Sequence, residues 1–142
     1  MTPDQVQLVQ RSFAKVAPIS EQAATIFYDR LFEVAPSVRA MFPDDMTEQR
    51  KKLMGTLAVV VGGLSNLEAV LPAASALAKR HVNYGVRPEH YPVVGGALLF
   101  TLEKGLGEGW TPPVAAAWTA AYGTLSSYMI SEAYDDRSQA AE

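Results

Sequence analysis

The feature that most constrains this fold is the regular placement of proline and glycine between segments with helical apolar spacing. Within such segments apolar residues return every three or four positions, as in Val6, Val9, Phe13 and Val16, which is the spacing of one helix face. No segment shows the sustained alternation of apolar and polar residues that is typical of a strand. The chain is therefore predicted to be all-α.

Capping patterns locate the helix starts. Thr2, Pro3 and Gln5 match an N-cap, a first-turn proline and a capping box, so the first helix is expected to begin there. Thr47 is the expected cap of the helix that follows the Asp44-Asp45 loop. After the first helix, which ends before Pro18, the predicted helices cover about residues 20–34, 36–42, 47–64, 72–82, 88–106 and 112–134.

Two glycine pairs lie within these predicted helices, at positions 62–63 and 95–96. Glycine in a helix interior costs roughly 1 kcal/mol relative to alanine. A compensating reason is expected, and the simplest is that the missing side chains let two helices cross closely.

Composition limits the classes of protein. With 142 residues, 49% of them apolar and 19% charged, residues 1–142 are expected to form one domain with its own core. The absence of cysteine excludes disulfides and thiolate metal sites, and it suits the cytoplasm. The formal charge of −3 argues against nucleic acid as a partner. We expect a cytoplasmic protein with no membrane span, because neither a secretory signal nor a long apolar run is found.

Histidine is informative because there are only two, His81 and His90. His81 closes a predicted helix whose inward face is Ala74, Leu77 and Ala78, so its imidazole is expected beside an apolar wall. One interpretation is a histidine placed favourably at a helix C-terminus, and the other is a ligand that faces a pocket. His90 is expected to be solvated.

Basic residues flank the segments that carry Gln49 and His81. They amount to six of the twelve Lys and Arg: Arg50, Lys51, Lys52, Lys79, Arg80 and Arg87. They form either a solvated charged face or a ring around a pocket for an apolar ligand with anionic ends. Haem meets the second description, because it is an apolar macrocycle with two propionates and an iron that imidazole ligates.

Several stretches, taken in order, resemble the globin family, in particular bacterial single-domain globins and the globin domain of flavohaemoglobins. They are residues 27–32 (FYDRLF), 36–42, 49–53 (QRKKL), 66–72, 79–81, 88–95 and 117–123. The resemblance covers nearly the whole chain. It implies a globin fold, which is a three-over-three helical sandwich around a haem b.

The resemblance also implies roles for individual residues. His81 matches the proximal histidine that ligates the iron, and Phe42 matches the phenylalanine that packs on the porphyrin. Tyr28 and Gln49 match the distal residues that donate hydrogen bonds to O2. Tyr91 matches a tyrosine near the proximal histidine in flavohaemoglobins.

Further haem contacts are expected from Lys52, Leu53, Leu77, Arg80, Val86 and Val94. Of these, Lys52 and Arg80 are expected to contact the propionates. One position departs from the flavohaemoglobins, in which a glutamate of the last helix completes a proximal network. Counting without gaps places Ala133 there, and Glu132 substitutes only if the register of the helix slips by one.

The function implied is the binding of O2, CO and NO at ferrous iron, with slow O2 release and nitric oxide dioxygenase activity. A chain of 142 residues has no room for a flavin domain, so a separate reductase is the expected electron donor. One alternative is an O2 carrier, storage protein or sensor without turnover. Another is a haem-free helical interaction module, which the retained Tyr28, Phe42, Gln49 and His81 disfavour.

Overall fold

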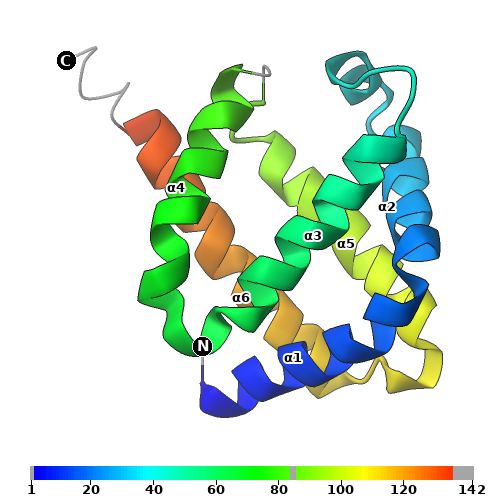
Figure 1. Cartoon of the computed structure of the whole chain (residues 1–142), viewed down its shortest axis with the longest axis vertical. Coiled ribbons are helices and arrows are strands. Elements are labelled where there is room, and N and C mark those ends of the chain that lie inside the picture. Colours follow the sequence, from blue (N-terminus) through cyan, green and yellow to red (C-terminus); the bar gives the residue numbers. More distant parts are fainter. Residues whose placement is uncertain (1, 84–85, 136–142) are drawn as a thin grey trace.

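The computed structural model describes residues 2–83 and 86–135, and within these ranges it contains helices and no strand (Figure 1). The all-α prediction is therefore confirmed. The α-helices are α1 (Pro3–Val16), α2 (Ser20–Val34), α3 (Thr47–Gly62), α4 (Leu67–Asn83), α5 (His90–Leu106) and α6 (Pro112–Ile130). Shorter 3₁₀ turns cover Ala17–Ile19, Pro36–Met41, Leu64–Asn66 and Gly107–Gly109, and a π-helical turn covers Ser131–Asp135.

The helices form two layers of three. Helices α1, α3 and α4 lie over α2, α5 and α6, with α1 and α4 packed on α6 and α3 packed on α2 (Figure 1). The closest packing within the second layer is between α2 and α5. This is the expected three-over-three sandwich.

The capping box predicted at the start of α1 is present. The Thr2 hydroxyl accepts a hydrogen bond from the Gln5 N–H, and the Gln5 side chain accepts one from the Thr2 N–H, both at 3.1 Å. The expected cap of α3 is wrong, because Thr47 is the first helical residue and Met46 is the N-cap. The Asp45 carboxylate accepts the Thr47 N–H at 3.0 Å instead.

Helix α4 begins at Leu67, five residues before the predicted start, and Pro72 lies inside it. The prolyl nitrogen cannot donate to the Glu68 carbonyl. Both residues are exposed, so that carbonyl can bond water, and the proline is tolerated. Helix α5 begins at His90 rather than at Pro88, because the preceding residues form a turn in which His90 N–H donates to the Arg87 carbonyl at 3.0 Å.

For one glycine of each pair, the structure shows why a side chain would not fit. A Cβ on Gly95 would lie 2.6 Å from Cε2 of Tyr122, so the ring of this α6 residue packs directly on the α5 backbone. A Cβ on Gly63 would overlap the side chain of Val70. The other glycine of each pair has open space around it, so the prediction of close approach holds for half of these positions.

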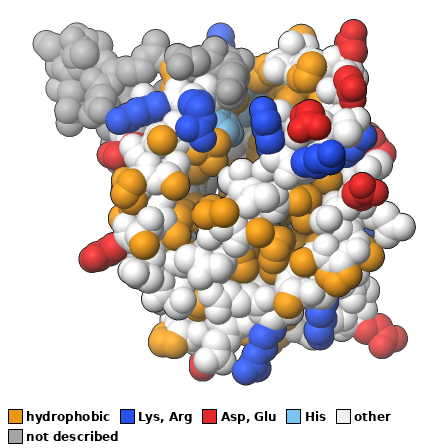
Figure 2. Space-filling model, viewed as in Figure 1, with side chains coloured by type: hydrophobic (Ala, Val, Ile, Leu, Met, Phe, Trp, Pro, Cys, Tyr) orange, Lys and Arg blue, Asp and Glu red, His pale blue; other side chains and the backbone are white. Residues whose placement is uncertain are grey.

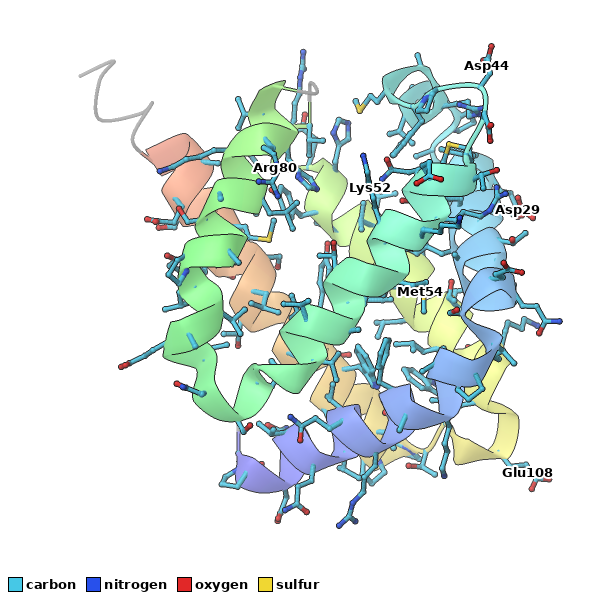
Figure 3. All side chains as sticks on the ribbon, in the orientation of Figure 1. Asp29, Asp44, Lys52, Met54, Arg80 and Glu108 are labelled. Atoms are coloured by element: carbon cyan, nitrogen blue, oxygen red, sulfur yellow. The ribbon has the colours of Figure 1, made fainter. Side chains whose placement is uncertain are left out.

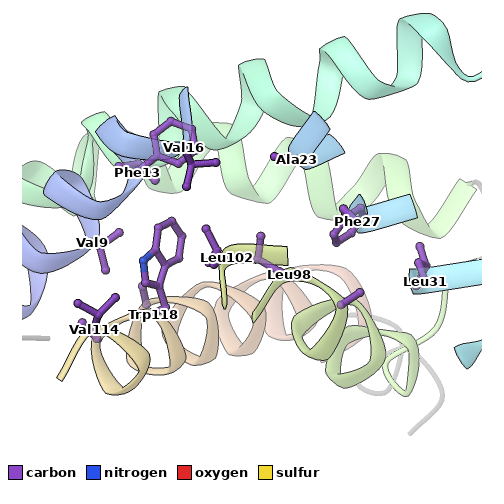
Figure 4. Packing of buried hydrophobic residues seen from close by; sticks show 14 of the residues in the cluster. Val9, Phe13, Val16, Ala23, Phe27, Leu31, Leu98, Leu102, Val114 and Trp118 are labelled. Atoms are coloured by element: carbon purple, nitrogen blue, oxygen red, sulfur yellow. The ribbon is translucent and has the colours of Figure 1, made fainter. Parts of the chain in front are cut away.

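The core lies where α1, α2, α5 and α6 meet (Figure 4). Its most deeply buried large side chains are Val9, Val16 and Leu102. A buried hydrogen bond of 2.8 Å crosses this core from the Trp118 indole N–H to the Ser12 hydroxyl. The core therefore joins α1 to α6 by a polar contact as well as by packing.

Within residues 2–83 and 86–135, no single helix has both the length and the apolar composition needed to cross a membrane. One bent pair, Thr47–Gly62 with Leu64–Val82, passes that test by length and composition alone, with a 49° bend.

Replacing Ser12 with alanine should destabilise the fold by about 1–3 kcal/mol, because it leaves the buried Trp118 N–H without an acceptor. Urea unfolding followed by tryptophan fluorescence measures the change. The matched control is Ser126→Ala, which removes an exposed bond to the Gly123 carbonyl of the same helix and should shift stability by less than about 0.5 kcal/mol. Equal losses of stability in Ser12→Ala and Ser126→Ala would contradict a stabilising role for the Trp118–Ser12 hydrogen bond.

Candidate functional site

The candidate site lies between α3, α4 and the start of α5. Among the described residues, α3 packs mainly on α2 and α4 mainly on α6, and neither runs closely along α5. Figure 2 shows a hollow on this face, with Lys and Arg side chains around it and a histidine side chain visible among them. The apolar residues predicted to contact haem are all partly exposed: Phe42, Leu53, Leu77, Val86 and Val94. Partly exposed apolar side chains around a hollow suit a large apolar ligand that would cover them.

Tyr28 and its neighbours form the α2 side of this site. Tyr28 is 5% exposed, and its ring packs edge-on against Phe27 and Phe42 with centroid distances of 4.9 and 5.5 Å. Phe32 lies one turn further along α2, 5.9 Å from the Tyr28 ring. These aromatic contacts fix the phenol ring, so its hydroxyl has a defined position.

Gln49 reaches this hydroxyl from the first turn of α3. Its amide N–H donates to the Tyr28 oxygen at 3.1 Å, which leaves the phenolic proton to point elsewhere. Burial raises the pKa of Tyr28, and the hydrogen bond from Gln49 opposes that rise in part. Tyr28 therefore remains a neutral hydrogen-bond donor. The resemblance implied that Tyr28 and Gln49 both donate to O2. In the structure, the Gln49 amide donates to the Tyr28 oxygen instead.

His81 lies near the end of α4. Its Nδ1 is 2.7 Å from the Leu77 carbonyl one turn earlier. A carbonyl can only accept, so Nδ1 carries the proton and Nε2 carries the lone pair, which is the tautomer that ligates a metal. Burial lowers the pKa of His81 and outweighs the opposing effect of the Leu77 bond, while Arg80 adds to the lowering. The imidazole is therefore neutral at pH 7.

Tyr91 packs beside this histidine from the first turn of α5. The two rings are nearly parallel, with an interplanar angle of 27° and a centroid distance of 6.4 Å. Tyr91 is 6% exposed. The predicted proximity of Tyr91 and His81 is therefore present in the structure. Val86 lies close to the backbone of His81, because its N–H donates to the His81 carbonyl at 3.0 Å.

His90 is partly exposed rather than fully solvated. Its Nδ1 accepts the Arg87 backbone N–H at 3.0 Å, so this ring stabilises the turn before α5. The Nδ1 atom of His90 is therefore already used as an acceptor within this turn.

Lys52 and Arg80 are exposed, and Figure 3 shows them facing each other from α3 and α4. Within the described residues the ion pairs are Arg30–Glu33 and Lys51–Glu48, so neither Lys52 nor Arg80 belongs to one. Their position suits a ligand with anionic groups at the mouth of the hollow.

At the expected position of the proximal glutamate, Ala133 is buried and Glu132 lies in the π-helical turn that follows α6. The Glu132 carboxylate accepts hydrogen bonds from the Ser75 hydroxyl at 3.0 Å and the Tyr128 hydroxyl at 3.2 Å. Ser75 is on α4, six residues before His81. Glu132 therefore contacts α4 at Ser75, which is six residues before His81 in the sequence.

Sequence reasoning missed Tyr122. Its hydroxyl donates to the Tyr91 carbonyl at 2.5 Å, and its ring covers Gly95. Burial raises the pKa of Tyr122 strongly. The sequence offered only a partial signal in Gly95, because a helical glycine is compatible with a ring packed on the backbone but Gly62 and Gly96 have open space instead.

Comparison with known proteins gives these findings. A profile described as Globin matches residues 25–129. The flavohemoprotein of Rhodopirellula baltica is 33% identical over 128 residues, which cover 88% of this chain and 31% of that protein. The flavohemoprotein of Bacillus subtilis is 29% identical over 142 residues, which cover 96% of this chain and 35% of that protein. The chain thus spans about a third of the length of these relatives.

Solved structures match over nearly the full length. A bacterial globin from Campylobacter jejuni superposes with a TM-score of 0.85 at 28% identity, covering 96% of this chain and 99% of that one. An engineered carbene transferase, based on a proposed nitric oxide dioxygenase of Rhodothermus marinus, gives a TM-score of 0.87 at 25% identity, with coverage of 100% and 99%.

Replacing Gln49 with leucine should raise the pKa of Tyr28 further, because the amide N–H that stabilises the phenolate is removed while burial remains. A spectrophotometric titration of the phenolate measures this shift, with Tyr28→Phe used to assign the transition. An unchanged Tyr28 pKa would show that the Gln49 bond is not formed in solution.

Proposed function

The chain belongs to the globin family, and from that premise we propose that it is a haem protein that binds O2 and oxidises NO to nitrate. A separate reductase would return the iron to the ferrous state. The observation that carries this proposal is the buried Tyr28 hydroxyl, which accepts a hydrogen bond from Gln49 and whose pKa is raised by burial. The Rhodothermus marinus relative, a proposed nitric oxide dioxygenase, supports the NO step, and the name flavohemoprotein supports the haem.

The residues present suit a haem. His81 would ligate the iron through Nε2, with the Leu77 carbonyl fixing its tautomer. The apolar residues around the hollow would contact the macrocycle, and Lys52 and Arg80 would contact the propionates. Haem b is proposed because the chain has no cysteine for thioether attachment. When bound, the group supplies the iron at which O2, CO or NO is taken up.

Tyr28 would discriminate between these ligands by charge. O2 held in such a pocket develops partial negative charge on its outer atom and accepts a hydrogen bond, whereas CO develops less. A neutral phenol donor whose ring is packed against Phe27 and Phe42 would therefore stabilise O2 by about 1–3 kcal/mol. Slow O2 release follows. That property suits a reaction in which O2 must remain bound until NO arrives.

An O2 carrier, storage protein or sensor is the second candidate. One observation favours it. Ala133 occupies the position at which flavohaemoglobins are expected to have a glutamate, and the neighbouring Glu132 carboxylate bonds Ser75 and Tyr128. NO consumption separates the two functions. A dioxygenase converts NO to nitrate repeatedly when O2 and a reductant are supplied, and a carrier does so at most once per haem.

The proposal extends to organisation and location. Residues 1–142 would form one globin domain, and the reliance on a separate reductase suits the cytoplasm, where reductants are supplied by metabolism.

His81→Ala should abolish most haem retention, because it removes the proposed iron ligand. The matched control is His90→Ala, since His90 makes its hydrogen bond to the Arg87 backbone. The absorption spectra of the ferric, ferrous and CO-bound forms measure retention. A normal ferrous-CO spectrum of His81→Ala without added imidazole would show that another residue ligates the iron.

Tyr28→Phe should speed O2 dissociation by about five- to 150-fold, the equivalent of losing about 1–3 kcal/mol of hydrogen bonding. CO dissociation should change much less. Stopped-flow measurements of both rates on wild type and variant test this. Equal changes for both gases would mean that Tyr28 acts as a steric gate, and no change would mean that its hydroxyl points away from the ligand.

A further inference from the structure

We propose that Arg39 is a positioning residue for the α2 side of the site. Its guanidinium ties the connection between α2 and α3 to the aromatic rings around Tyr28, and it thereby holds Phe42 and Gln49 against that tyrosine. The inference rests on the proposed function, because it treats Tyr28 as the donor to bound O2.

The connection between α2 and α3 has few hydrogen bonds of its own. It consists of the 3₁₀ turn Pro36–Met41 and of residues 42–46, which belong to no helix (Figure 1). Phe42 is extended, with φ −118° and ψ 154°, as expected before a proline, and Pro43 has no N–H to donate. Within residues 2–83 and 86–135, no backbone N–H donates to the carbonyls of Phe42, Pro43 or Asp44. These three carbonyls therefore depend on a side chain or on water for a partner.

The Arg39 side chain is that partner. Its Nη1 donates to the Pro43 carbonyl at 2.9 Å and to the Phe42 carbonyl at 3.3 Å, and its Nη2 donates to the Asp44 carbonyl at 3.3 Å. A guanidinium carries five N–H donors in a planar fork, so one side chain can bond three successive carbonyls. Hydrogen bonds from a charged donor are also stronger than those from a neutral one. The path of the chain directly after Phe42 is therefore fixed by this one residue.

The same guanidinium contacts α2. Its Cζ lies 5.1 Å from the centroid of the Phe32 ring, which is within cation–π distance. The Phe32 ring lies 5.5 Å from the Phe42 ring and 5.9 Å from the Tyr28 ring, and the last two are 5.5 Å apart. Arg39 therefore holds Phe42 in two ways, through its carbonyl and through the ring on which it packs.

The segment held by Arg39 also leads directly into α3. The Asp45 carboxylate accepts the Thr47 N–H at 3.0 Å at the start of this helix, and Gln49 follows in its first turn. The Gln49 amide donates to the Tyr28 oxygen at 3.1 Å. The influence of Arg39 thus reaches Tyr28 along two paths, one through the packed rings and one through the Gln49 amide.

The test is a double-mutant cycle on O2 dissociation, measured by stopped flow. Arg39→Met keeps the aliphatic stem and removes the donors and the charge. In the wild-type background we expect O2 dissociation to be about fivefold faster, the equivalent of about 1 kcal/mol, with CO dissociation nearly unchanged. In the Tyr28→Phe background the same substitution should change O2 dissociation by less than about twofold, because the donor that Arg39 positions is already absent.

Two further variants test the geometry. Arg39→Lys keeps the charge but lacks the planar fork, so it should restore only part of the slow O2 release. The matched control is Arg30→Met. Arg30 is a residue of α2 whose guanidinium lies 4.5 Å from the Phe100 ring centroid and pairs with Glu33 at 3.0 Å, so it makes the same kinds of contact away from the connection. This control should leave both dissociation rates unchanged.

A second measurement needs no bound haem. Gln49→Leu is expected to raise the pKa of Tyr28 in the wild-type background. If Arg39 holds Gln49 in place, the rise should be smaller in the Arg39→Met background, in the same phenolate titration of the full chain. A rise no smaller than in the wild-type background would overturn the proposal.

The outcomes are separable. An unchanged O2 rate in Arg39→Met, or equal fold-changes in the wild-type and Tyr28→Phe backgrounds, would overturn this proposal and leave the proposed function standing. If the wild type takes up no haem, the proposed function fails, and the phenolate titration still decides the role of Arg39. If circular dichroism shows that Arg39→Met does not fold, Arg39→Lys takes its place in both cycles under the same criteria.

Discussion

The separation of α3 and α4 is the constraint on which the rest of the site depends. Helix α3 packs on α2 and α4 packs on α6, so the two helices stand on different supports. The space between them is bordered by side chains that remain partly exposed, among them Leu53 and Leu77. A chain that closed this space would bury more apolar surface by itself. The arrangement therefore gives up some packing and leaves the hollow seen in Figure 2.

Burial disfavours the charged form of the titratable side chain on each side of that hollow. It raises the pKa of Tyr28 and lowers the pKa of His81, because a low dielectric disfavours the charged form of either group. The phenol is thereby kept as a donor and the imidazole as a neutral ligand. Each also has one fixed polar partner, Gln49 for Tyr28 and the Leu77 carbonyl for His81. One physical effect thus prepares two opposite chemical roles.

The sequence predicted features that depend on neighbours in the chain. The capping box of α1 and the range of α2 were correct because both rest on local hydrogen bonds and helical spacing. The start of α4 was wrong because an exposed Pro72 costs less than a buried one. The bond from Gln49 to Tyr28 depends on the distance between α3 and α2, which no local pattern encodes. The place of Glu132 likewise depends on a π-helical turn that changes the register at the end of α6.

Helix α6 connects the site to the core through polar contacts with three helices. Trp118 bonds Ser12 of α1, Tyr122 bonds the backbone of α5, and Glu132 of the following π-turn bonds Ser75 of α4. These three hydrogen bonds join α6 and the turn after it to α1, α5 and α4. The two helices that carry His81 and Tyr91 are therefore held by polar contacts to the same end of the chain as well as by packing.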